Sequence, residues 1–254
     1  MITPEYLLTP AELDVLWHEL ELGRLPYPLD VPSVGGTADE RARMRRTLLD
    51  ERPDLVGDQR LADFLRLLAE HEIAVDAVAH LERPVRAVAV SSGDRAVLAV
   101  IDSDRVGLLE IRPTALARSI VEVLPDGAAG PGIALSLRQE TLDAAVRLYE
   151  DPPEDDDDPW GGTDLNERDA LRQAGLSEQD AAQIAELAAG RVAGGQFGVS
   201  RWSQFRTERA GALITWFDTH NGRYLMVNEN GWLSLSPTDN ERIAARISSV
   251  LTTV

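Results

Sequence analysis

Apolar residues recur with a helical period through most of the first 70 residues of the chain. In the stretch TPAELDVLWHELEL, four of them fall on one helix face: Leu13, Leu16, Trp17 and Leu20. Thr9 and Glu12 have the spacing of a capping box, and Pro10 suits the first helical position. A second helix is expected after Thr37, and a third over residues 59–70.

The period changes to two after residue 73. VRAVAV and AVLAVI flank the turn sequence SSGDR, and DSDR leads into VGLLEI. This pattern predicts an antiparallel meander of about four strands. Pro113 ends the meander and begins a helix.

A second group of strands is expected near the C-terminal end. GALITWFD and RYLMVN flank THNG, a strong hairpin signal, and NENG forms another turn into WLSLS. Helices are predicted before these strands, one of them capped by Ser177, and a last one follows Pro237. Trp216 and Phe217 are strand neighbours, so their side chains point to opposite faces. One of the two could be core while the other is exposed or covers the second face.

The segment GGQFGVSRW at residues 194–202 has two readings. A phosphate-binding loop needs a strand before it, a helix after it and usually a cation. Here a predicted helix precedes the segment and a strand follows it, and the chain has no lysine. We therefore predict a strand, with Phe197 and Val199 on one face and Gln196 and Gly198 on the other.

Two parts of the sequence show the same order of features. Gly93–Leu124 and Gly222–Leu251 each run from a glycine and then an arginine through an apolar strand, a polar turn and a second strand to a proline-led helix. The prediction is an α+β fold of antiparallel sheets packed by helices, in two pseudo-twofold related halves. Residues 1–150 would form the N-terminal half, 151–163 an acidic linker and 164–254 the C-terminal half, together one compact domain.

Composition limits the chemistry. The chain has a net charge of -18, no cysteine, four scattered histidines and arginine as its basic residue throughout. We expect no catalytic metal, no organic cofactor, no nucleic acid partner and no membrane insertion. No basic start followed by an apolar run follows Met1, and no apolar run reaches the ~20 residues of a membrane span, so a cytoplasmic protein is expected.

Two other functions stay open on composition alone. A small cytoplasmic enzyme could assemble a carboxylate-based site that no motif reveals. An acidic mimic of nucleic acid is supported by charge only. Aromatic residues concentrate after the acidic segment, where they could anchor an interface or fill a core.

Taken in order, several segments resemble the EspG family of ESX (type VII) secretion-associated proteins: LLTPAELDVLWHELELGRLPYPL, GDRAVLAVID, RPTALARSIVEVLP, GQFGVSRW, the hairpin at NGRYL and SPTDNERIAARISSVL. The resemblance implies a cytosolic chaperone that binds the hydrophobic tip of the PPE-type protein in a PE–PPE heterodimer. In this chain the connection between the strands near Leu81 and Val85 is only about Glu82–Pro84. Some members of the family carry a longer loop there, and that loop touches the substrate.

The expected contact surface joins one face of the central sheet to the helices between residues 165 and 189. Location and residue type select six candidate partner contacts: Arg86, Leu171, Leu176, Ile184, Phe197 and Trp202. The chaperone itself is expected to be a monomer or a weak homodimer.

Overall fold

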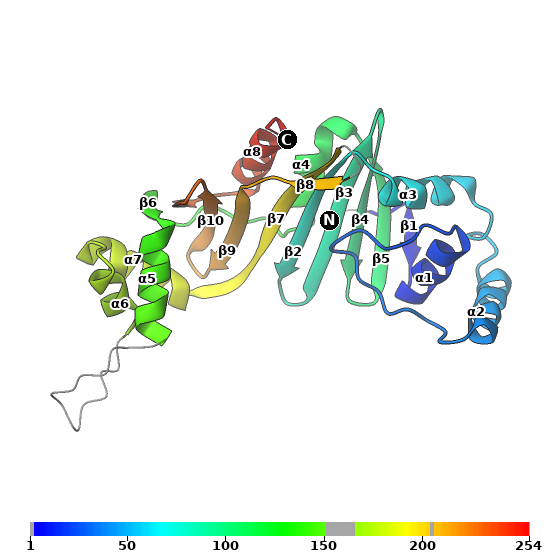
Figure 1. Cartoon of the computed structure of the whole chain (residues 1–254), viewed down its shortest axis with the longest axis horizontal. Helices are drawn as coiled ribbons and strands as arrows, with labels where there is room; N and C mark the ends of the chain where they lie inside the picture. Colours follow the sequence, from blue (N-terminus) through cyan, green and yellow to red (C-terminus); the bar gives the residue numbers. More distant parts are fainter. Residues whose placement is uncertain (1–2, 151–165, 204–205, 254) are drawn as a thin grey trace, which may run out of the picture. The chain divides into compact units, whose positions relative to one another are not determined.

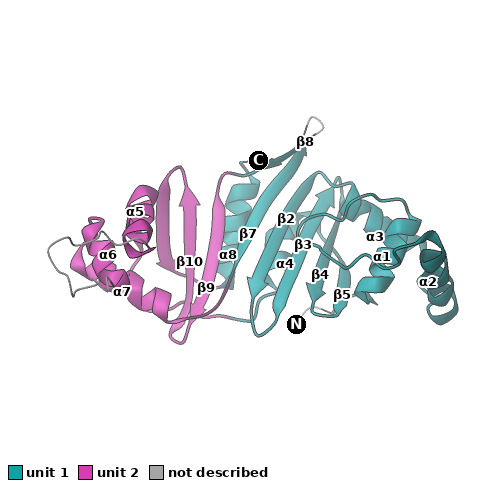
Figure 2. Ribbon diagram, turned by 60° about the horizontal axis from the view of Figure 1, so that its bottom comes forward, with its two compact units in different colours: residues 1–126, 195–210, 240–254 teal, residues 127–194, 211–239 magenta. Residues whose placement is uncertain are grey.

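A computed structural model describes residues 3–150, 166–203 and 206–253 of the chain. These residues form two compact units, neither of which is a contiguous piece of sequence (Figure 2). Unit 1 contains residues 1–126, 195–210 and 240–254, and unit 2 contains residues 127–194 and 211–239.

Unit 1 is built on an antiparallel sheet, most of whose strands follow the N-terminal helices along the chain (Figure 1). Its strands lie in the order β1-β5-β4-β3-β2-β7, and β8 pairs with β7. The strands are β1 (Tyr6–Leu8), β2 (Ile73–His80), β3 (Pro84–Ser92), β4 (Arg95–Asp102), β5 (Arg105–Ile111), β7 (Arg191–Ser203, its first four residues assigned to unit 2) and β8 (Arg206–Arg209). The helices are α1 (Pro10–Glu19), α2 (Ala38–Glu51), α3 (Gln59–Ala69), the 3-10 turn η1 (Pro113–Ala115), α4 (Leu116–Val121) and α8 (Asn240–Leu251).

The helices of unit 1 begin where the sequence predicts. Thr9 and Thr37 each accept a hydrogen bond from the backbone N–H three residues on, and each capping box is completed by the glutamate at that position. Asp58 caps α3 by accepting hydrogen bonds from the backbone N–H groups of Arg60 and Leu61. These caps satisfy backbone donors that a helix leaves without an internal partner.

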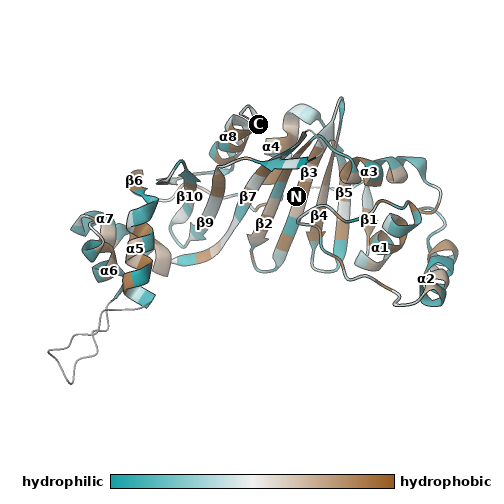
Figure 3. Ribbon diagram, viewed as in Figure 1, coloured by the Kyte–Doolittle hydropathy of each residue, from teal (hydrophilic) through white to brown (hydrophobic). Residues whose placement is uncertain are grey.

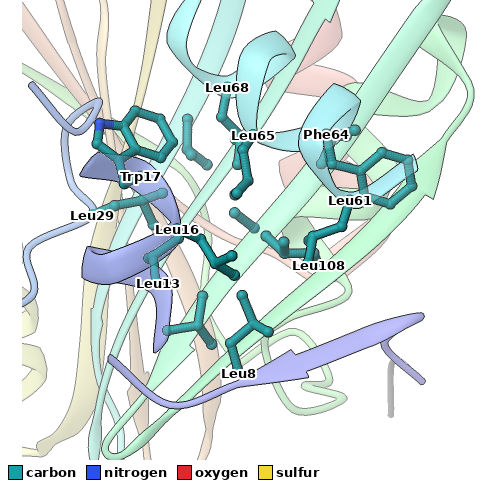
Figure 4. Packing of buried hydrophobic residues seen from close by; sticks show 14 of the residues in the cluster. Leu8, Leu13, Leu16, Trp17, Leu29, Leu61, Phe64, Leu65, Leu68 and Leu108 are labelled. Atoms are coloured by element: carbon teal, nitrogen blue, oxygen red, sulfur yellow. The ribbon is translucent and has the colours of Figure 1, made fainter. Parts of the chain in front are cut away.

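One face of the sheet packs on α1 and α3 to form the main core of this unit. Figure 4 shows Leu13, Leu16 and Trp17 of α1 and four residues of α3 converging on Leu8 and Leu108; the α3 residues are Leu61, Phe64, Leu65 and Leu68. Each fully buried side chain of this size contributes about 1.5–3 kcal/mol. The predicted apolar faces of both helices are confirmed.

The central strands β2, β3 and β4 consist mostly of apolar residues, as Figure 3 shows by their colour, and most of these residues are buried. The second face is covered by α4, which packs on all three strands and against α8. Burial on both sides explains why VRAVAV and AVLAVI read as nearly continuous apolar runs rather than as strict alternation.

Unit 2 contains a smaller antiparallel sheet and three helices. Its strands lie in the order β9 (Leu213–Thr219), β10 (Gly222–Glu229), β11 (Trp232–Pro237) and β6 (Leu135–Arg138). The helices are α5 (Gln139–Glu150), α6 (Glu167–Gln173) and α7 (Glu178–Ala189). Leu187 of α7 packs with Phe217, Tyr224 and Leu235 of the sheet, whereas a second cluster joins α5, α6 and α7.

The sheet of unit 2 buries an arginine. Arg223 of β10 is 1% exposed and makes a two-point ion pair with Asp218 of β9 at 2.7 and 2.8 Å. Residues 127–130 cross this arginine: the Ala128 carbonyl accepts from the Arg223 N–H, and the Arg223 carbonyl accepts from the Gly130 N–H. Trp216 and Phe217 are both buried, and they lie at 0% and 8% exposure.

The α+β class with antiparallel sheets packed by helices is confirmed. GGQFGVSRW is a strand, as predicted, with Phe197 and Val199 buried and Gln196 exposed. The two similar segments both form a hairpin followed by a helix, β4-β5 to α4 and β10-β11 to α8. Their pseudo-twofold relation stays a prediction, and so does the three-part division of the chain, because the acidic segment 151–163 lies outside the described residues.

Candidate functional site

On the side of α1 and α3, part of the sheet in unit 1 lies beyond the strands on which these two helices mainly pack. We call it the Asp76 face. It comprises Tyr27 and Arg209, whose contacts are described below, and seven strand residues: Asp76 and Val78 of β2, Arg86 of β3, and Gln196, Gly198, Ser200 and Trp202 of β7. Alternation along each strand places them on the side of the Ala74 and Val88 side chains, which belong to the α1–α3 core. The helix α3 packs on β3 and β4, and α1 packs on β1 and β5, so both lie toward the other edge of the sheet.

Strand β7 lies beside β2 and completes this face. The Trp202 N–H donates to the Glu72 carbonyl at 2.7 Å, and a side chain at Gly198 would meet the Asp76 carboxylate. As residue numbers rise along β7, its neighbours on β2 fall, so the two strands run antiparallel. This register brings Gly198 next to Asp76.

An ion pair between a buried acid and a half-exposed arginine lies at the centre of the Asp76 face. Arg209 Nη2 of β8 donates to Asp76 Oδ2 at 3.0 Å, with the Asp76 side chain 6% exposed and that of Arg209 49% exposed. Burial raises the pKa of Asp76 above its usual value, and the Arg209 charge opposes this shift. The arginine therefore offsets part of the cost of placing a carboxyl group on an otherwise apolar strand.

Gly198 makes this ion pair possible. A Cβ atom at residue 198 would lie 1.9 Å from Arg209 Nη2 and 2.8 Å from Asp76 Oδ1. The guanidinium thus lies directly across the β7 backbone to reach β2. A glycine inside a strand often marks such a close approach, and this is the role of the third glycine in GGQFGVSRW.

The loop between α1 and α2 borders the same face. The Arg209 guanidinium carbon lies 5.7 Å from the centroid of the Tyr27 ring, within range of a cation–π contact. Three residues on, Asp30 accepts from Arg86 Nη1 at 3.2 Å. Tyr27 is 64% exposed and Trp202 is 51% exposed, so the face presents two aromatic rings to solvent.

The six predicted contact residues divide between the two units. In unit 1, Arg86 and Trp202 lie on the Asp76 face, whereas Phe197 is fully buried on the opposite face of β7 and serves as core. In unit 2, Leu171 is buried in the α5–α7 cluster, and Leu176 and Ile184 are half-buried against it. Contact of these six residues with a partner stays a prediction. In this conformation, the side chains of Arg86 and Trp202 are exposed and can reach a partner.

Sequence reasoning did not select the residues that form the ion pair of this face and its aromatic contact, which are Asp76, Arg209 and Tyr27. One signal was present for Asp76, an acid in the middle of IAVDAVAH where neighbouring positions are apolar. Arg209 belongs to a short strand of four exposed residues, RTER, with no apolar pattern. Tyr27 lies in an irregular loop, so no periodicity marked it.

Within the described residues, no group of three or more His, Asp or Glu side chains is arranged to hold a metal ion. Over the same part of the chain, none of the helices has both the length and the apolar character of a membrane span.

Comparison with known proteins gives a family and a fold. A sequence search of curated proteins finds no significant match. The structure is similar to that of the type VII secretion system chaperone EspG5 of Mycobacterium tuberculosis, solved in complex with a PE25–PPE41 dimer. The TM-score is 0.73 at 15% identity, over 98% of this chain and 96% of that one. The model of the EspG family matches residues 9–249, so this chain belongs to the EspG family.

Proposed function

We propose that this protein is a cytoplasmic chaperone of a type VII secretion system. It binds the PPE-type protein of a PE–PPE heterodimer and keeps that pair soluble until export. The observation that carries the proposal is the family match over residues 9–249. The shared fold with EspG5, whose structure is a complex with PE25–PPE41, supports the same class of partner.

The Asp76 face offers the residue types that such binding needs. Aromatic residues and arginines supply most of the binding energy in protein interfaces, and this face exposes Tyr27, Trp202, Arg86 and Arg209. An apolar tip on an export substrate would aggregate if it stayed exposed. Burying about 800 Å² on each protein is enough for a specific complex. Leu176 and Ile184 of unit 2 remain further candidate contacts.

The charge of the chain fits a carrier that acts by binding rather than by catalysis. A net charge of -18 keeps the free chaperone in solution and disfavours nucleic acid and anionic lipid. Selectivity for a protein partner then rests on local features of the surface, such as the arginines of the Asp76 face, rather than on the overall field.

Co-expression with the PE–PPE pairs encoded beside this gene tests the function directly. A tag on this chain should recover one such pair as a complex of defined stoichiometry, and the pair should precipitate when the chaperone is omitted. If every neighbouring pair stays soluble alone and none co-elutes, while a turnover assay on small molecules finds activity, the chaperone function is wrong and the enzyme alternative replaces it.

Substitutions on the Asp76 face test the location. We expect Tyr27→Ala and Trp202→Ala each to weaken binding of the recovered pair at least about tenfold, as truncated aromatic anchors do. Trp232→Ala is the matched control, because Trp232 is a tryptophan of unit 2 with 47% exposure. Equal losses of affinity for Trp202→Ala and Trp232→Ala, or no loss for Tyr27→Ala and Trp202→Ala, would show that the interface does not lie on the Asp76 face.

A further inference from the structure

The ion pair of Asp76 and Arg209 is asymmetric in its exposure. The carboxylate is buried in the sheet, whereas half of the arginine side chain faces solvent. Exposed ion pairs contribute little to stability, and buried ones often contribute less than apolar residues of the same volume. Stability therefore gives no reason for an acid at this place on β2.

Three contacts fix the position of the Arg209 guanidinium. Asp76 accepts one of its hydrogen bonds, the bare backbone at Gly198 lies beneath it, and the Tyr27 ring lies beside it. Asp76 is the one hydrogen-bond acceptor of this side chain within the described part of the protein. A guanidinium has five N–H donors, so most of them remain available at the surface.

The surroundings of Arg209 limit what these donors can bind. They lie on the face that exposes Tyr27 and Trp202, so the bound segment carries apolar side chains next to its hydrogen-bond acceptors. The net charge of -18 repels a segment rich in carboxylates. Backbone carbonyl oxygens carry no net charge, and the C-terminal end of a helix leaves four of them without partners and carries a partial negative charge.

Building on the proposed function, we propose that Asp76 is a positioning residue for Arg209, and that Arg209 binds the free carbonyl oxygens at the C-terminal end of a helix in the bound protein. Tyr27 and Trp202 contact apolar side chains of the same helix end. The buried carboxylate keeps the guanidinium in one orientation before binding, which reduces the entropy that is lost when the complex forms.

Four variants separate this role from a structural one. Arg209→Lys keeps the charge but loses the planar fork. Asp76→Asn removes the negative charge that holds the guanidinium, without changing the shape of the buried side chain. The double variant Asp76→Leu with Arg209→Met replaces the whole pair by apolar groups, so it should fold. Arg60→Met is the control, because Arg60 also forms ion pairs, with Glu5 and Glu110, away from this face.

The experiment is calorimetric titration of each variant with the PE–PPE pair recovered by co-expression, together with its urea unfolding midpoint. We expect the first three variants to bind about tenfold or more weakly, the double variant to keep the wild-type midpoint, and Arg60→Met to bind like the wild type. Double-variant binding within twofold of the wild type would show that the ion pair is structural only.

Two further outcomes distinguish the parts of the inference. If the wild-type chain binds no PE–PPE pair, the proposed function fails, and the role of Arg209 fails with it. If the wild type binds, but neutralising one carboxylate of the bound protein causes the same loss as Arg209→Lys and the two losses are not additive, the acceptor is that carboxylate. Unchanged affinity after neutralisation of each such acid supports the helix end.

Discussion

The guanidinium of Arg223 lies 4.7 Å from the centroid of the Trp216 ring, inside the sheet of unit 2. Asp218 binds the same guanidinium through both carboxylate oxygens. The charge is thus removed from water but held by an anion and by the face of an aromatic ring. This arrangement makes Trp216 a fluorescent reporter of the ion pair.

Breaking the pair from the acidic side should be the more damaging change. Asp218→Asn leaves the Arg223 charge buried, and we expect a loss on the order of 3 kcal/mol in the free energy of unfolding. Arg223→Met leaves Asp218, whose side chain is 21% exposed, able to reach water, so its loss should be smaller. Urea unfolding followed by tryptophan fluorescence measures both, and a larger loss for Arg223→Met would contradict this account.

The glycines that cross Arg223 should not tolerate a side chain. A Cβ atom at Gly127 would lie 2.4 Å from the Arg223 guanidinium carbon, and one at Gly130 would lie 2.3 Å from Tyr224 Cζ. We expect Gly127→Ala and Gly130→Ala each to cost about 1–3 kcal/mol through overpacking. Gly211→Ala is the control, because nothing lies within 4 Å of its added Cβ atom. If the control loses as much stability as the other two, the close approach is not the cause.

Asp58 should stabilise α3 both as a cap and as a charge. Its carboxylate accepts from two backbone N–H groups and from the Tyr6 hydroxyl, and the pKa of Asp58 is lowered chiefly by the backbone N–H of Leu61. Asp58→Ala should cost about 1 kcal/mol, and Asp58→Asn less, since asparagine also caps helices.

The lowered pKa of Asp58 sets the sign of its pH effect. Its charge contributes stability above the usual value of 3.8, and this contribution is lost as the pH falls from there through the folded-state pKa. Unfolding midpoints of wild type and Asp58→Asn should therefore converge in acid. Midpoints that diverge as the pH falls would show that the charge is unfavourable.

His71 should make the protein less stable in weak acid. Burial lowers the pKa of His71 below 6.5, although its Nδ1 lies 2.9 Å from the Leu68 carbonyl oxygen. The unfolded chain takes up a proton first as the pH falls through 6.5, so stability drops until the folded-state pKa is reached. His71→Gln should flatten this dependence between about pH 7.5 and pH 5.5. An equally steep loss in the variant would assign the effect to other groups.

Local signals predicted most of the elements because they depend on neighbours in sequence. The capping boxes at Thr9 and Thr37 and the hairpin turn at Asn230–Gly231 each specify backbone geometry within a few residues, and each was found. The strand reading of Phe197 and Val199 also followed from order along the chain. The sequence did not show that Phe197 belongs to the core, because this depends on what packs against the face of β7 opposite the Asp76 face.

The Asp76 face could not be predicted because it depends on contacts between distant segments. Asp76 and Arg209 are separated by 133 positions, and Tyr27 reaches the same arginine from a loop without periodicity. No spacing rule connects such residues. The acid in the middle of an apolar strand was the one local anomaly. Its role became clear only from the register of β7 beside β2, which places Gly198 and the Arg209 guanidinium next to Asp76.

The way the chain is shared between the two units has a consequence for its synthesis. Unit 1 takes most of its residues from the first half of the sequence, but it also contains α8, whose residues 240–251 are translated after every residue of unit 2. The face of the sheet near α4 therefore lacks α8 while the ribosome makes all of unit 2. Nascent chains arrested before residue 240 should expose this apolar surface and be bound by general chaperones, so a chaperone of this fold is itself a substrate for others until α8 has left the ribosome.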